Sequence, residues 1–99
     1  MPKKKARAAP ARQADFTTVA ELDLHAHTVE EAIVKLDVFL YESYRRRLDR
    51  VRVIHGKGTG TLKLEVRRYL SRHSLVISYA DADRWHGGEG ATDVELSRK

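Results

Sequence analysis

The chain has 99 residues, of which 41% are apolar and 33% are charged, so we expect one domain with one hydrophobic core. It contains no cysteine, which excludes disulfides and thiolate metal sites and suits a reducing cytoplasm, where we expect it to act. No apolar run reaches the length of a membrane span, and no apolar segment follows the N-terminal lysines. The composition therefore indicates neither a membrane protein nor a secreted one.

The net charge of +5 is concentrated near the N-terminus. Five basic residues precede the first acidic residue, Asp15: Lys3, Lys4, Lys5, Arg7 and Arg12. Without them, the 19 lysines and arginines fall to 14 and balance the 14 acidic residues. We therefore predict a disordered basic arm over residues 1–18 and a folded domain over residues 19–99. The arm either makes salt-dependent phosphate contacts through its lysines or acts only as a solubilising tail.

Apolar periodicity and turn residues predict the element order β-α-β-α-β-β. The first strand is expected at Leu22–Leu24. A helix follows from Thr28 to about Arg46, because Thr28 and Glu31 have the spacing of a capping box. Its buried stripe is expected to consist of Val29, Ala32, Ile33, Leu36, Phe39 and Leu40.

The second half of the chain repeats this alternation and then adds two strands. We predict a strand at Val51–Ile54, a helix from about Thr61, a strand at Leu75–Tyr79, a polar loop at Asp81–Gly90 and a strand at Ala91–Leu96. The second helix should bury Leu62, Val66, Tyr69 and Leu70. The fold class is α/β (α+β), a two-layer sandwich of two helices on a four-stranded mixed sheet that is parallel in its first half.

Polar side chains follow the first two strands where each one ends. Asp23 and His25 are two residues apart, so they point to the same face, and His55 ends the next strand. Ligands of open α/β sheets bind beyond the carboxyl ends of strands, so the three should converge if the strands are neighbours. A carboxylate beside imidazoles suits acid–base catalysis. Each histidine has a structural alternative, which we adopt for His27 and His73, and His86 falls in the loop before Gly87.

A glycine-rich turn, Gly56-Lys57-Gly58-Thr59-Gly60, follows His55 and precedes the second helix. Glycines allow close backbone approach, and a helix N-terminus favours an anion. We therefore predict phosphate contacts at Gly56, Lys57, Gly58 and Gly60, although the same segment is also compatible with a plain turn. It matches neither a P-loop nor a dinucleotide fingerprint.

Basic residues also accumulate from Arg45 to Arg72, a segment that contains ten basic residues and only two acidic ones, Asp49 and Glu65. This excess indicates either a footprint for a polyanion, with Arg67 and Arg68 among its contacts, or two solvated helix faces. The ten are Arg45, Arg46, Arg47, Arg50, Arg52, Lys57, Lys63, Arg67, Arg68 and Arg72.

Three segments together resemble the Smr (small MutS-related) family over roughly Ala20 to Leu96. They are Leu22-Asp23-Leu24-His25, His55-Gly56-Lys57-Gly58-Thr59-Gly60 and Gly87-Gly88-Glu89-Gly90-Ala91-Thr92. The closing Gly90-Ala91-Thr92-Asp93-Val94-Glu95-Leu96 is most similar to the Smr domain that ends MutS2 proteins. The initiating Met1 favours a stand-alone Smr protein over an excised domain.

The resemblance implies a fold like the C-terminal domain of bacterial translation initiation factor three, and nuclease activity on DNA or RNA. Related proteins act in recombination control or cleave messenger RNA on stalled ribosomes. The family's function falls on Asp23 and His25, and its glycine motif adds His55, Gly56 and Gly58. Two departures stand out. Ala26-His27 replaces the usual Gly and apolar residue, and Asp93 replaces an apolar residue, so one face of the last strand is expected to be solvated.

We expect an endonuclease that acts on DNA or RNA, including branched DNA or ribosome-bound mRNA. His25 would be the general base or acid, Asp23 would orient it or help to hold a metal, and His55 would be the complementary acid or a phosphate contact. The sequence leaves the metal unknown, with Mg²⁺ and Mn²⁺ as the ions considered, and predicts a monomer or weak dimer. One alternative is a nucleic-acid- or ribosome-binding module without catalysis. A small phosphometabolite enzyme is the other.

Overall fold

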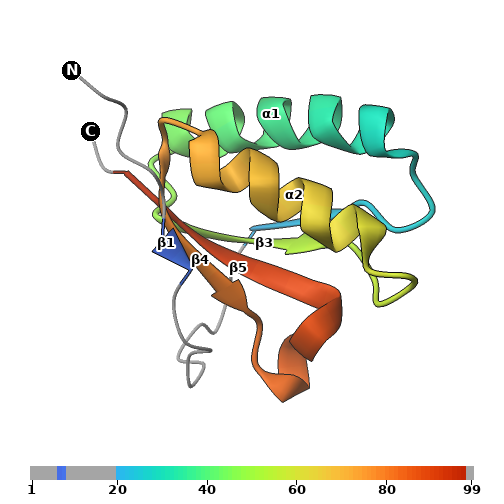
Figure 1. The fold of residues 1–99 in the computed structure, drawn as a ribbon. Coiled ribbons are helices and arrows are strands. Elements are labelled where there is room, and N and C mark those ends of the chain that lie inside the picture. Colours follow the sequence, from blue (N-terminus) through green and yellow to red (C-terminus); the bar gives the residue numbers. More distant parts are fainter. Residues whose placement is uncertain (1–6, 9–19, 98–99) are drawn as a thin grey trace.

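Both helices lie on one face of a mixed β-sheet, which makes a two-layer sandwich (Figure 1). The structure is a computed structural model that describes residues 7–8 and 20–97. Its main elements are β1 (Arg7–Ala8), β2 (Ala20–Asp23), α1 (Val29–Arg45), β3 (Arg50–Ile54), α2 (Thr61–Arg72), β4 (Val76–Asp81) and β5 (Ala91–Leu96). Two short 3₁₀ turns, η1 (Arg84–His86) and η2 (Gly88–Gly90), occupy the predicted polar loop. The predicted fold class and element order are confirmed.

The sheet has the strand order β1-β4-β5-β3-β2. β2 and β3 pair in parallel, with Asp23 opposite Ile54, whereas β5 is antiparallel to both β3 and β4. The strands β2, β3 and β4 therefore run in the same direction, and their carboxyl ends meet at one edge of the sheet. This edge is where a ligand site is expected in an open α/β sheet.

A fifth strand, β1, joins the four that the sequence pattern predicts. Arg7 and Ala8 pair in parallel with Ser78 and Tyr79 of β4. Two residues are too short to show a strand period, so pattern analysis misses them. The rest of the predicted arm, including Lys3, Lys4 and Lys5, lies outside the described residues, and the arm stays a prediction.

The helices cover the sheet through the predicted apolar stripes. Thr28 caps α1, because its Oγ1 accepts from the Glu31 amide at 3.2 Å and its own amide donates to Glu31 Oε1 at 3.0 Å. Side chains from both helices and the sheet form one buried cluster: Leu24, Ala32, Leu36, Leu40, Val51, Val53, Val66, Leu70, Val76, Val94 and Leu96. In the described part of the chain, neither helix is long and apolar enough to cross a bilayer.

The prediction that one face of the last strand is solvated is wrong. Thr92 is 0% exposed, Val94 1% and Asp93 only 9%, because β5 lies between β3 and β4 in the middle of the sheet. Asp93 is accommodated there by Arg52, which lies directly opposite on β3 and donates from Nε to Oδ1 at 2.7 Å. The Arg52 guanidinium also lies 3.3 Å from Glu21 on β2.

Candidate functional site

Asp23 and His25 form an exposed hydrogen-bonded pair where β2 ends. The His25 amide lies 3.0 Å from Asp23 Oδ1, and the ring Nδ1 lies 2.6 Å from the same oxygen. These two hydrogen bonds, the ring's first, lower the pKa of the Asp23 carboxyl. An ionised carboxylate only accepts, so Nδ1 carries the proton and donates it. With Nδ1 protonated, Nε2 is the nitrogen that can accept a proton from a ligand, and the His25 side chain is 66% exposed.

The turn after β3 lies next to this pair. The Leu24 amide donates to the Ile54 carbonyl at 2.7 Å, which extends the pairing of β2 with β3 beyond Asp23. A β-carbon placed on Gly56 would lie 3.5 Å from Cβ of His25. The structure therefore brings Asp23, His25 and Gly56 together at the carboxyl edge of the sheet, where the strand-end pattern predicts that Asp23, His25 and His55 converge.

His55 lies beside the same turn, but its ring is buried and only 5% of the residue is exposed. Its Nδ1 lies 3.0 Å from the Gly56 carbonyl oxygen and its Nε2 lies 2.8 Å from Thr92 Oγ1. Burial lowers the pKa of His55, so the neutral ring donates from Nδ1 and accepts from the threonine hydroxyl. Both nitrogens thus face protein partners, and the ring joins the glycine turn to β5.

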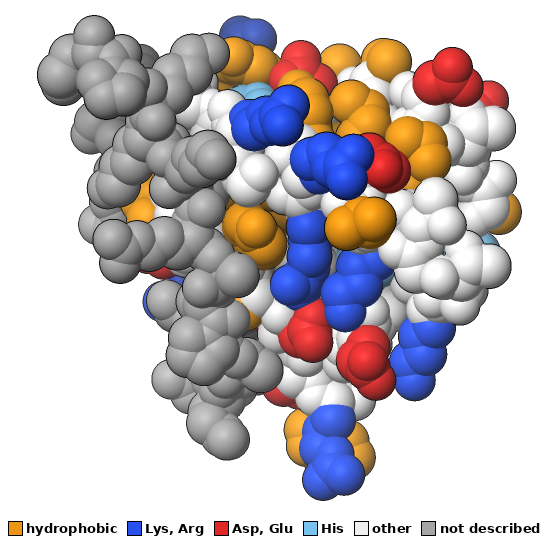
Figure 2. All heavy atoms as spheres, viewed as in Figure 1, with side chains coloured by type: hydrophobic (Ala, Val, Ile, Leu, Met, Phe, Trp, Pro, Cys, Tyr) orange, Lys and Arg blue, Asp and Glu red, His pale blue; other side chains and the backbone are white. Residues whose placement is uncertain are grey.

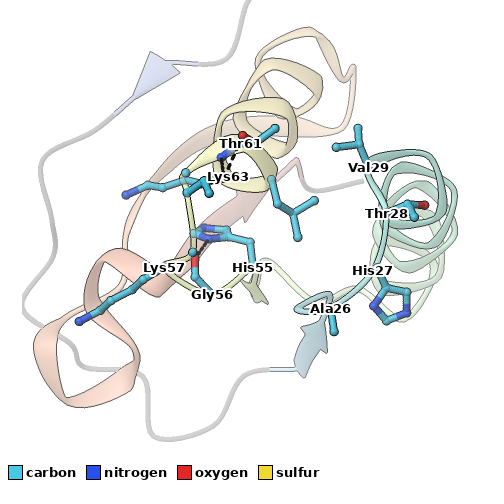
Figure 3. Close-up of a pocket in the computed structure, with 13 residues that line it drawn as sticks. Ala26, His27, Thr28, Val29, His55, Gly56, Lys57, Thr61 and Lys63 are labelled. Carbon is cyan, nitrogen blue, oxygen red and sulfur yellow. Dashed lines mark hydrogen bonds between the residues drawn. The ribbon is translucent and has the colours of Figure 1, made fainter.

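The glycine turn borders a pocket of about 360 Å³. Figure 3 shows Ala26, His27, Thr28 and Val29 at one side, before and at the start of α1, and His55, Gly56, Lys57 and Lys63 at the other. Gly56, Gly58 and Gly60 have φ values of +78°, +33° and +87°, which side chains with a β-carbon rarely adopt. The lining does not include Asp23 or His25, which flank the turn instead.

The chemistry of this pocket favours an anion. Gly60 occupies the N-cap of α2 without a side-chain cap, and the first turn of the helix contains no acidic residue. A helix N-terminus attracts negative charge, although the Thr61 amide already donates to Thr59 Oγ1 at 3.4 Å. Lys57 lines the same space, and so does Lys63, which also lies 3.0 Å from Asp81. The pocket is thus suited to a phosphate group.

The other predicted basic contacts are mostly paired or distant from this pocket. Arg67 lies 2.5 Å from Asp81 and above the Tyr79 ring, Lys63 lies 3.0 Å from the same carboxylate, and Arg68 lies 3.5 Å from Glu65. On the face of the molecule drawn in Figure 2, acidic side chains lie beside basic ones. Arg45 is the last residue of α1, about 25 Å from the start of the helix, and Arg46 and Arg47 follow it. The predicted Arg45–Arg72 footprint is therefore divided by the fold.

The remaining histidines each have a local partner. His73 is buried between Tyr41 and Tyr69, with Nε2 3.2 Å from Asp37, and His27 Nδ1 lies 3.2 Å from the His25 carbonyl. His86, on η1, is hydrogen-bonded through its ring to Asp83, the N-cap residue of that turn. Trp85 lies between them in the sequence and is 84% exposed. The sequence pattern assigns no role to Asp83 or Trp85. The presence of the chain's one tryptophan in a polar loop is, however, a signal that indicates an exposed contact residue. Among residues 7–8 and 20–97, no three His, Asp or Glu side chains are grouped to hold a metal.

Comparison with known proteins gives a consistent result. The Smr domain family model matches residues 22–97. The chain is 41% identical over 75 residues to endonuclease MutS2 of Caldicellulosiruptor saccharolyticus, and 44% identical over 78 residues to that of Thermus thermophilus. These matches cover 76% and 79% of this chain but 10% of each relative, so the chain spans about a tenth of their length.

Two solved structures share the fold. The crystal structure of the Smr domain of Thermus thermophilus MutS2 has a TM-score of 0.78 and 43% identity, covering 80% of this chain and 99% of that one. YdaL, a stand-alone small MutS-related protein from Escherichia coli, has a TM-score of 0.76 and 29% identity, covering 90% and 81%. The chain belongs to the Smr domain family.

Proposed function

We propose that this Smr domain cleaves phosphodiester bonds in nucleic acid, with Asp23 and His25 as its proton-transferring pair. The observation that carries the proposal is the 2.6 Å contact between His25 Nδ1 and Asp23 Oδ1, which orients a ring whose side chain is 66% exposed. This pair flanks a glycine turn whose pocket suits a phosphate. The name of the MutS2 relatives, endonuclease, supports the same reaction class.

In the proposed reaction, Lys57 and the amides at the start of α2 hold a backbone phosphate beside His25. Nε2 of His25 takes a proton from the attacking oxygen, while Asp23 stabilises the imidazolium that forms. On RNA this oxygen is the 2′-hydroxyl, and on DNA it belongs to water. The new P–O bond forms as the bond to the leaving 5′-oxygen breaks, and that oxygen takes up the proton held by His25, delivered through solvent, which returns His25 to its neutral form. His55 acts as a positioning residue for the turn.

The residues around Asp23 do not favour a metal role for this carboxylate. Asp23 Oδ1 is already engaged by His25, and the described residues offer no third carboxylate or imidazole beside it. The donor set therefore does not form a site for Mg²⁺ or Mn²⁺ by itself, and no step of the reaction is assigned to such an ion.

The test is a cleavage assay with labelled RNA, single-stranded DNA, duplex DNA and branched DNA, each in Mg²⁺, Mn²⁺ or EDTA. We expect His25→Ala to lower the cleavage rate by about 10² to 10⁴-fold and to leave binding nearly unchanged. Val34→Ala is the control, because Val34 is 66% exposed on α1 and is not among the residues that line the pocket. Cyclic phosphate ends on RNA would identify the 2′-hydroxyl as the nucleophile. Undiminished cutting by His25→Ala would exclude the pair as catalytic.

A second candidate function is binding without cleavage. The observation in its favour is that the pocket is lined without Asp23 or His25, so it can hold a phosphate by itself. This function predicts salt-sensitive binding in the same assay and no cleavage of any substrate in any metal condition.

A further inference from the structure

We propose that Trp85, on the loop between β4 and β5, stacks on an unpaired base of the nucleic acid whose phosphate occupies the pocket. The inference rests on the proposed function only in taking a nucleic acid as the ligand. It adds a preference for single-stranded over fully paired strands.

The first observation is that the Trp85 side chain is exposed although its backbone is held firmly. The residue is 84% exposed, more than any other large hydrophobic residue of the described chain. Asp83 fixes the backbone: its Oδ1 accepts from the Trp85 amide at 2.9 Å, and its carbonyl accepts from the amides of His86 and Gly88, both at 2.9 Å. Oδ2 of Asp83 lies 2.6 Å from His86 Nδ1. The loop therefore presents the indole to solvent in a defined position, which is the arrangement of a preorganised contact residue.

The second observation is the position of the loop. It leaves the carboxyl end of β4, and thus the same edge of the sheet at which Asp23 and the glycine turn lie. The Gly90 carbonyl at its end accepts from the amides of His55 and Gly56, at 3.0 and 2.9 Å. A β-carbon placed on Gly90 would lie 3.5 Å from Cγ of Lys57, whose side chain leaves the turn on the side away from Ala26 and His27 (Figure 3). Lys57 thus lies between the phosphate pocket and the loop.

The third observation is the chemistry beside the indole. The Arg84 guanidinium carbon lies 5.8 Å from the centre of the Trp85 ring, so a cation accompanies the aromatic face. The loop also contains an exposed acidic residue, Glu89. The Asp83 carboxylate, in contrast, is occupied by the Trp85 amide and the His86 ring. An aromatic ring with a neighbouring arginine, at the same edge of the sheet as a phosphate pocket, is a combination that suits the binding of single strands by stacking. A base inside a duplex has no free face to offer.

The sole tryptophan of the chain makes the test direct, because fluorescence excited at the long-wavelength edge of the indole band, where the four tyrosines do not absorb, reports on Trp85 alone. The probes are oligothymidylate, oligouridylate, an abasic strand of the same length and a blunt duplex, all in EDTA. We expect the two single strands to quench the fluorescence and the abasic strand and duplex to leave it nearly unchanged. Equal quenching by the abasic strand, or no quenching by either single strand, would overturn the inference.

Variants then separate stacking from folding. Trp85→Ala should weaken single-strand binding by about tenfold in anisotropy measurements, whereas Trp85→Phe should retain most of it. Val38→Ala is the matched control, since Val38 is 52% exposed on α1 and should have no effect. If Trp85→Ala weakens duplex binding as much as single-strand binding, the stacking role is excluded. Quenching without cleavage would overturn the proposed nuclease and leave the stacking role standing, and cleavage without quenching would do the reverse.

Discussion

The ring of His55 shows how burial of one residue links the stability of the site to pH. Its pKa lies below the ordinary value of 6.5 because the neutral ring is buried between the Gly56 carbonyl and the Thr92 hydroxyl. In the unfolded chain the same ring takes up a proton near pH 6.5. Above that pH both states are neutral. Below it the unfolded state binds the proton first, so acid favours unfolding.

We therefore predict that the free energy of unfolding falls between about pH 7.5 and about pH 5.5, and that His55→Gln reduces this fall. Denaturant titrations at the two pH values measure the change, and an NMR titration of the His55 ring should give a midpoint below 6.5. His27→Gln, which removes a histidine outside the buried contacts of His55, should keep the pH dependence of the parent. A His55 midpoint at or above 6.5 would contradict the prediction.

Single-residue features of the site differ in how far the sequence reveals them. The pairing of Asp23 with His25 follows from their spacing of two at a strand end, which local geometry alone decides. The orientation of His55 does not follow, because its ring is directed by Thr92, 37 residues away in the chain. Ala26 is intermediate: its place in the family motif marks a departure from glycine, and the structure gives it a φ of +66°. Left-handed backbone of this kind costs about 1 kcal/mol in a residue with a β-carbon.

The pairing of β3 with β5 depends on a buried charge pair at the level of whole strands. Arg52 and Asp93 lie opposite one another in the register, and both are at most 9% exposed. Removing one partner of such a pair leaves an uncompensated buried charge, whereas an exposed partner contributes little. Asp93→Ala should therefore lower the free energy of unfolding by about 3 kcal/mol.

Glu21→Ala provides the matched control for Asp93, because it removes the other carboxylate beside Arg52. The Glu21 side chain is 49% exposed, so we expect a loss below about 1 kcal/mol. Replacing both Arg52 and Asp93 by leucine should recover most of the stability that Asp93→Ala loses. Equal losses for the two single variants would show that burial does not set the strength of these contacts. Thermal or denaturant unfolding measures all of them.

Element order was predictable because each helix and strand carries its own period, and Thr28 with Glu31 marks the start of α1. The place of a strand in the order of the sheet, at the edge or in the middle, does not follow from its own sequence period. The pattern of β5 resembles a half-solvated strand, yet β5 lies in the middle of the sheet and Asp93 is accepted there through a partner 41 residues away. The two-residue β1 is similarly defined by its neighbour β4 rather than by its own residues.

At the scale of the whole molecule, the described domain pairs much of its charge internally. Lys63 and Arg67 share Asp81, Arg52 is held by Asp93, and Arg68 lies near Glu65. The excess of +5 equals the five basic residues that precede Asp15. The long-range attraction to a polyanion should therefore come mainly from those residues, and the pocket should add a local contact that salt weakens less.

This division gives a prediction for the salt dependence of binding. Changing Lys3, Lys4 and Lys5 together to alanine should reduce the slope of log K against log salt on duplex DNA by about 3, since each phosphate contact contributes about 0.9. Changing Lys57 to alanine should lower the slope by about 1 and should also weaken binding at high salt, because Lys57 lines the pocket itself. Anisotropy titrations over a range of salt concentrations measure both slopes. If the triple variant keeps the parent slope, the attraction does not come from these three lysines, and Arg7, Arg12 and the basic residues at the end of α1 become the residues to test next.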